Sequence, residues 1–217
     1  MSKLIVYGCS FSLPFDDLFQ GVEKGWPELL ALELKLEYVN RAVAGSGWNN
    51  ISLNIEEDIL SGKISKEDLI IISPSYFQRI TFPELIIEGT RQSYDLIGKY
   101  GKPQDSYVKL NIQRFCYKLH SLNEMGYRAY GWCWTPTGNR KEKTTNSNLL
   151  KYIDLLIPAP DGSLFWEDWI LDNPKYMLIQ GGPIKGSLDF KGDTHFSKHG
   201  HKEVSNYFKS FLLPIYN

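Results

Sequence analysis

The sequence predicts a single α/β domain with a doubly wound, mostly parallel β-sheet covered by helices on both faces. Short apolar runs, each bounded by glycine or proline, alternate with segments of helical periodicity about five times along the chain. The 217 residues suit one domain with a full core. No internal repeat and no shift of composition marks a second unit, so we expect one domain over residues 1–217.

The first half of the chain supplies three strands and two helices of this pattern. Apolar runs that stop at Gly8 and at Pro74 are typical of buried parallel strands. Apolar residues at helical spacing follow Trp26, and Pro27 is acceptable in a first helical turn. We therefore expect strands over 4–7, 37–40 and 69–72, and helices over 26–36 and 50–59.

The second half continues the alternation. A long amphipathic segment stops at Gly126, and Ser197 has the position of an N-cap for a closing helix. We expect helices over 105–125 and 163–171, a fourth strand over 127–134 and a fifth over 176–180. Residues 75–103 mix proline and glycine with apolar patches, which favours an insertion or a lid, and 141–148 should form a polar surface loop.

Composition argues against several classes of protein. The net charge of −1 and the lack of a basic block give no reason to expect nucleic acid. No apolar stretch reaches 18 residues, and the run after Lys3 is too short for a signal peptide, so we expect a cytoplasmic chain without a membrane span. Cys9, Cys116 and Cys133 lack C-x-x-C spacing, which argues against a disulfide framework or a zinc site. Most of the six tryptophans should be core, with one or two on a sugar-binding surface.

The first stretch that can carry chemistry is Gly8-Cys9-Ser10-Phe11-Ser12, directly after the first strand. Ligands of open α/β sheets bind outside the carboxyl ends of the strands, so Ser10 is a candidate nucleophile. The alternative is a tight turn in which the serine caps a helix. A second stretch runs from Asn40 to Ile51 and contains Gly45, where backbone N–H groups could approach an oxyanion, or which could simply form a glycine-rich turn.

The third stretch contains Asp193 and His195. In extended backbone, residues i and i+2 point to the same side about 7 Å apart, so the carboxylate could hold one imidazole nitrogen. The other nitrogen would then accept a proton from a hydroxyl. A divalent metal site with His199 and His201 is the alternative. Those two histidines would point to different sides at a helix N-terminus, so we expect no metal, and a packing or capping role for His201.

Taken together, these stretches resemble the SGNH (GDSL-type) hydrolase superfamily. The matching residues are Gly8-Cys9-Ser10-Phe11-Ser12, then Asn40-x-Ala42-x-x-Gly45, then Asp193-x-His195-Phe196-Ser197-x-x-Gly200-His201, and their order and spacing match over essentially the whole chain. The resemblance implies a flavodoxin-like three-layer α/β/α sandwich with a five-stranded sheet. It implies Ser10 as nucleophile, Gly45 as an oxyanion donor, and Asp193 with His195 as orienter and base.

Three departures from the family pattern matter. Cys9 replaces the commoner aspartate before the serine, and we interpret it as a packing residue. Asp193 precedes His195 by two positions where D-x-x-H is usual, although relatives that acetylate alginate look similar in using D-x-H. The third family block, G-x-N-D, is absent, because strand three is followed by Ser73-Pro74-Ser75. The missing donor could be Asn49, Asn50, Ser73 or Ser75, and Asn49 is our choice.

The expected function is therefore a serine esterase with a Ser-His-Asp triad and no cofactor. A small acyl or acetyl ester, on a carbohydrate or another small molecule, is the preferred substrate. A lipid ester, a thioester and transfer to another hydroxyl stay open, as does the oligomeric state. The alternative is a non-catalytic SGNH-like binding or structural module, which the missing third block motivates. A nucleotide-binding domain is disfavoured, because neither a G-x-G-x-x-G nor a Walker pattern occurs.

Overall fold

The computed structural model describes residues 2–13, 24–74, 77, 79–87, 90–95, 105–134, 152–179 and 193–216. Its centre is a sheet of four parallel strands in the order β2-β1-β3-β6. These strands are β1 (Lys3–Gly8), β2 (Glu37–Asn40), β3 (Leu69–Ser73) and β6 (Arg128–Gly131). The predicted α/β class with a parallel sheet is therefore confirmed.

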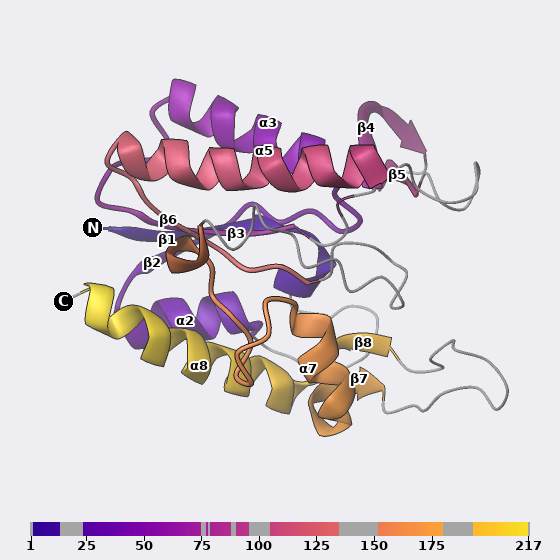
Figure 1. The fold of residues 1–217 in the computed structure, drawn as a ribbon. Helices are drawn as coiled ribbons and strands as arrows, with labels where there is room; N and C mark the ends of the chain where they lie inside the picture. The colour runs from indigo at the N-terminus through magenta and orange to yellow at the C-terminus, as the bar shows by residue number, and fades with distance from the viewer. Residues whose placement is uncertain are drawn as a thin grey trace, which may run out of the picture.

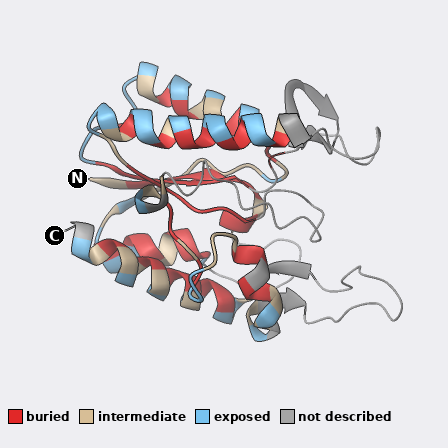
Figure 2. Cartoon of the chain, viewed as in Figure 1, coloured by how far each residue is buried: buried red, intermediate tan, exposed pale blue. Residues whose placement is uncertain are grey.

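Helices cover both faces of this sheet, which makes three layers (Figure 1). They are α2 (Trp26–Leu34) with α8 (Lys198–Tyr216) on one face, and α3 (Trp48–Leu60) with α5 (Asp105–Glu124) on the other. Alternate residues of β1 serve the two cores: Leu4 packs towards α2 and α8, and Ile5 packs towards α3 and α5. Buried residues accordingly fill the sheet and the inner sides of the helices (Figure 2).

The sheet has four described strands and not the predicted five. The segment expected to be strand five is β7 (Met177–Ile179), which pairs antiparallel with β8 (Asp193–Phe196) as a separate ribbon. The place beside β6 is taken by two isolated parallel bridges, Gly131 to Leu156 and Cys133 to Phe165. Pro158 and Pro160 lie between these two bridges, and proline lacks the N–H that a continuous strand would need.

The remaining described elements connect this framework. Within 75–103, β4 (Arg79–Ile87) and β5 (Thr90–Asp95) form an antiparallel hairpin, and the predicted loop over 141–148 lies outside the described residues. Short helices follow β6: η2 (Ile153–Leu155), α7 (Trp166–Asp172) and η3 (Pro174–Tyr176). The Oγ of Ser197 accepts a hydrogen bond from the N–H of Gly200 at 3.1 Å, so the predicted N-cap is confirmed. Of the helices described, none combines the length and apolarity needed to cross a membrane.

All six tryptophans are buried, so the expectation that one or two line a sugar-binding surface is wrong. Trp26, Trp132, Trp134 and Trp166 pack edge to face between the sheet and helix α8, together with Phe208. Each indole removes about 150–250 Å² from water, and this core depends on that contribution.

Candidate active site

The strand order fixes where a site should lie. From β1 the chain first adds β2 on one side and then β3 on the other, so β1 and β3 flank the topological switch point. Gly8 pairs with Ser73 at the carboxyl ends of these two strands. A Cβ built on Gly8 would lie 2.7 Å from Ser12 Oγ and 3.1 Å from Ser73 Cβ. Glycine at this position therefore allows the turn after β1 to close against β3.

Ser10 begins the turn η1 (Ser10–Ser12), which follows β1 directly. The turn is closed by backbone hydrogen bonds from Ser12 N to Cys9 O at 3.0 Å and from Leu13 N to Ser10 O at 3.1 Å. Cys9 is fully buried in the core with Phe11, so its predicted packing role is confirmed. Ser10 is half-buried at the edge of the sheet, in the place expected of a nucleophile.

The loop over 40–47 continues along the end of β1. Arg41 N donates to Val6 O at 2.8 Å, and Val43 N donates to Gly8 O at 3.1 Å. Asn40 fixes the start of the loop: its Oδ1 accepts from Ala42 N at 2.9 Å, and its Nδ2 donates to Ser12 O at 3.4 Å. The loop is thus tied to the turn that carries Ser10.

Gly45 follows in this loop with φ of 72°, in the left-handed region that favours glycine. It lies three residues before α3, whose N-cap Gly47 provides no side-chain hydrogen bond to the helix. A helix N-terminus carries partial positive charge, so this end of α3 favours an anion in its neighbourhood. The glycine and the helix start are the features that an oxyanion-binding loop requires.

The four candidates for the third donor are separated by their surroundings. Asn49 is exposed in the first turn of α3, whereas Asn50 is buried and donates from Nδ2 to Ser46 Oγ at 2.8 Å. Ser73 is buried beside Gly8, and among the described residues its Oγ has no hydrogen-bond partner. Ser75 lies outside the described residues.

Asp193 and His195 lie on β8, and the structure describes the backbone of both residues but not their side chains. This strand runs antiparallel to β7, with Met177 opposite Phe196 and Ile179 opposite Asp193. The extended backbone expected for this stretch is therefore present. Strand β8 lies beside η1, so the backbones that carry Ser10 and His195 are neighbours in space although they are far apart in sequence.

One tryptophan joins these two segments. Phe11, which follows Ser10, stacks on Trp134 with ring centroids 3.9 Å apart and an interplanar angle of 18°. Phe196, which follows His195, meets the same indole edge to face with centroids 5.7 Å apart. Trp26 adds a hydrogen bond from its Nε1 to Phe11 O at 2.9 Å. The sequence predicted Trp134 only as the end of the fourth strand, because nothing local relates it to either stretch.

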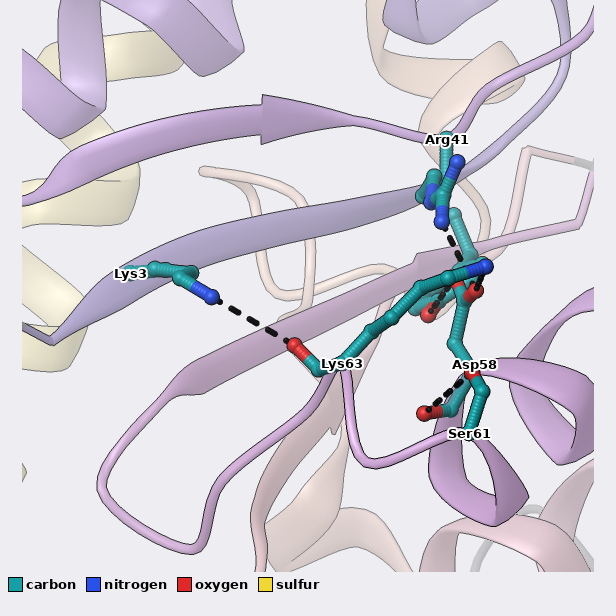
Figure 3. A network of polar contacts seen from close by, with 6 residues as sticks. Lys3, Arg41, Asp58, Ser61 and Lys63 are labelled. Atoms are coloured by element: carbon teal, nitrogen blue, oxygen red, sulfur yellow. Dashed lines mark hydrogen bonds and ion pairs between the residues drawn. The ribbon is translucent and has the colours of Figure 1, made fainter.

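A polar network centred on the buried Asp58 lies at the start of the 40–47 loop (Figure 3). Tyr7 donates its hydroxyl to Asp58 Oδ2 at 2.8 Å, and Arg41 donates to Asp58 Oδ1 at 2.7 Å. Lys63 Nζ lies 3.2 Å from the same Oδ1. Burial alone would raise the pKa of Asp58, but hydrogen bonds from Tyr7, Lys63 and Arg41 outweigh it and lower the pKa. The carboxylate therefore stays charged and anchors Arg41 at the start of the loop.

His201 is a structural residue. It is buried, and its Nδ1 accepts a hydrogen bond from Trp26 N at 3.0 Å, at the start of α2. This confirms the predicted packing or capping role. In the part of the chain that the structure describes, no three histidine, cysteine or acidic side chains cluster as a metal site would require.

Comparisons with known proteins match the fold as a whole. No protein-family model matches the sequence, and no curated protein matches it. Among solved structures, the psychrotrophic esterase EstA from a Pseudoalteromonas species, in a structure inhibited by monoethylphosphonate, superposes with a TM-score of 0.54 at 13% identity, covering 99% of this chain and 98% of that one. A lipolytic protein of the G-D-S-L family from Veillonella parvula gives a TM-score of 0.53 at 13% identity, covering 99% and 98%.

A carbohydrate esterase, described as having an active site with divergent catalytic and non-catalytic binding functions, gives a TM-score of 0.50 at 12% identity, covering 98% of this chain and 65% of that one. These identities are low, and what the proteins share with this chain is the fold. The chain has the three-layer fold of the SGNH, or GDSL-type, hydrolases, so the resemblance found in the sequence is confirmed at the level of the fold.

Proposed function

We propose that this chain, which has the SGNH hydrolase fold, is a serine esterase that cleaves a carboxylic ester. Ser10 is the nucleophile, His195 the base, Asp193 the group that orients His195, and Gly45 a backbone donor of the oxyanion hole. The observation that carries the proposal is the contact of β8 with η1, which brings the segments of Ser10 and His195 together at the switch point of the sheet.

The proposed reaction has two steps. Ser10 Oγ attacks the ester carbonyl carbon while its proton passes to His195, and the negative oxygen of the tetrahedral intermediate is held by backbone N–H groups. The intermediate collapses, the bond to the alcohol oxygen breaks, and His195 returns the proton to that oxygen. A water molecule activated by His195 then attacks the acyl-serine, releasing the carboxylic acid and restoring Ser10.

A small acyl group, such as acetyl, is the proposed acyl part, and a carbohydrate is one possible alcohol part. Because all six tryptophans are buried, they give no support for a sugar-binding surface. The support that remains is the shared fold with a carbohydrate esterase, which is an analogy of fold. Transfer of the acyl group to another hydroxyl uses the same acyl-serine and differs only in the acceptor.

For the third oxyanion donor we retain Asn49. Asn50 is already engaged with Ser46 inside the protein, which disfavours the nearest alternative. Removing one such donor typically lowers turnover by about 10²–10³. Asn49→Ala should therefore reduce kcat strongly with little change in KM, and Asn50→Ala should be mild. If neither substitution matters, the donor is Ser73 or Ser75.

The test is hydrolysis of nitrophenyl esters of increasing acyl length and of acetylated sugars, with Ser10→Ala as the inactive variant. Ser12→Ala is the matched control, because Ser12 lies in the same turn with its hydroxyl buried. Ser10→Ala should abolish turnover at an unchanged melting temperature, and Ser12→Ala should remain active. Wild-type protein that binds these esters without hydrolysing any of them would instead identify the non-catalytic binding module.

A further inference from the structure

The outer sides of α3 and α5 carry most of the exposed large apolar side chains of the molecule. Six such side chains are exposed among the described residues, and five of them line one groove between these two helices. They are Leu53, Leu60, Leu110, Tyr117 and Met125. The groove has a volume of about 940 Å³, and the sixth exposed side chain, Leu32, lies on α2 at the opposite face of the sheet.

The fold of one chain gives these residues no role. Helices α3 and α5 already bury an inner stripe against the sheet, for example Ile55 and Phe115, and Figure 2 shows exposed residues on the sides that face away. Leu60 is 87% exposed and Tyr117 is 66% exposed, so neither contributes much to the core. An amphipathic helix needs one apolar stripe, and further exposed apolar side chains that gather in one groove mark a surface that a partner can cover.

The charges on this face are segregated in a way that fits a second copy of the chain. Along the groove, α3 contributes the exposed Glu56, whereas α5 contributes the exposed Arg114 and the half-buried Lys118. Within one chain, Lys118 pairs with Glu56 across the groove. A two-fold axis parallel to the two helices would place α3 of each copy over α5 of the other, with acidic residues facing basic ones.

The size of the face is also in the range of a dimer interface. The 20 residues of α5 span about 30 Å and the 13 residues of α3 span about 20 Å, so two helices each about 10 Å wide present roughly 500 Å² on each copy. Two copies would bury about 1,000 Å² in total, which is the lower limit for a specific interface. The face therefore suffices for a weak homodimer.

We infer that the α3–α5 face is the interface of a homodimer, in which the stretch from Leu53 to Leu60 of each copy packs over the region of Leu110 and Tyr117 of the other. None of the residues named for this contact belongs to the proposed triad, although Asn49, the proposed oxyanion donor, also lines the groove. The surface would be self-complementary, so the assembly closes at two chains.

The test is the molecular mass in solution of the full chain, measured by light scattering and sedimentation from about 1 µM to about 100 µM. Wild type should show twice the chain mass of 25.0 kDa at the upper concentrations. Leu60→Glu and Tyr117→Glu should be monomers with unchanged circular dichroism and melting temperature at low concentration, because both side chains are exposed. Leu32→Glu is the matched control, since it places the same charge at an exposed leucine on another face and should stay dimeric.

A charge reversal tests the role of the basic side of the groove. Arg114 lines the groove, so Arg114→Glu should weaken dimerisation. The inference is overturned if wild type is monomeric throughout, if both groove variants stay dimeric, or if the protein is monomeric with a bound lipid or other apolar molecule in place of the second copy.

Discussion

Replacing Asp58 by alanine should lower the free energy of unfolding by about 2–4 kcal/mol. The hydroxyl of Tyr7, which is fully buried, donates to Asp58, and a buried hydroxyl left unpaired costs about 1–3 kcal/mol. The bonds to Arg41 and Lys63 add about 0.5 kcal/mol each, because both cations are partly exposed and screened by water. The sum of these contributions gives the expected loss of about 2–4 kcal/mol.

The assay is chemical or thermal unfolding followed by circular dichroism. For a chain of this length, 1 kcal/mol corresponds to about 2–4 °C, so the melting temperature should fall by about 4–16 °C. Glu57→Ala is the matched control, because Glu57 is the exposed neighbour on the same helix, and it should change stability by less than about 0.5 kcal/mol. Tyr7→Phe should cost much less in the Asp58→Ala background than in wild type.

The pH dependence of the free energy of unfolding is a second test of the same prediction. The pKa of Asp58 is lowered from 3.8 in the folded chain, so the unfolded state takes up a proton first as the pH falls. The stabilisation by its charge is therefore complete well above pH 3.8 and is lost as the pH falls through the folded pKa. The gap between wild type and Asp58→Asn should close over this acid range. A loss below about 0.5 kcal/mol for Asp58→Ala at neutral pH would refute the assigned network.

Three further substitutions test the proposed site. Gly8→Ala should lower kcat more than it raises KM, because the new Cβ would lie 2.7 Å from Ser12 Oγ and displace the turn of Ser10; an unchanged kcat would contradict this packing. Gly45→Ala should cost about 1–2 kcal/mol of strain at its positive φ and slow turnover, as measured by unfolding and ester hydrolysis together. Trp134→Leu should destabilise the chain and reduce acylation of Ser10, whereas Trp134→Phe should recover much of the rate; full activity in the leucine variant would exclude a positioning role.

The parts of the fold that follow local periodicity could be predicted from the sequence. Strand β2 spans Glu37–Asn40 as expected, and α5 spans Asp105–Glu124 against a prediction of 105–125. These segments combine a clear apolar pattern with a definite stop, such as Gly126, which has a φ of 85°. Local patterning was sufficient because each segment buries one face on the same sheet.

Contacts between residues that lie far apart in the sequence could not be predicted from local patterns. Tyr7 and Asp58 lie 51 positions apart, and no local pattern relates them. The segment of β7 has the composition of a strand, but it pairs with β8 as a separate ribbon and does not join the central sheet. The sequence indicated Asn40 only as part of a motif. In the structure its side chain accepts a hydrogen bond from the N–H of Ala42, two residues later, which is the Asx turn that asparagine favours.

The central claim is that Ser10 is a nucleophile activated by His195, and covalent labelling tests it most directly. Wild-type protein should react with a fluorophosphonate to give one adduct per chain, and peptide mass spectrometry should locate it on Ser10. The adduct should vanish in Ser10→Ala and form far more slowly in His195→Ala, while Ser12→Ala should still be labelled on Ser10. A folded wild-type chain that takes up no label, or one labelled on any other residue, would contradict the account.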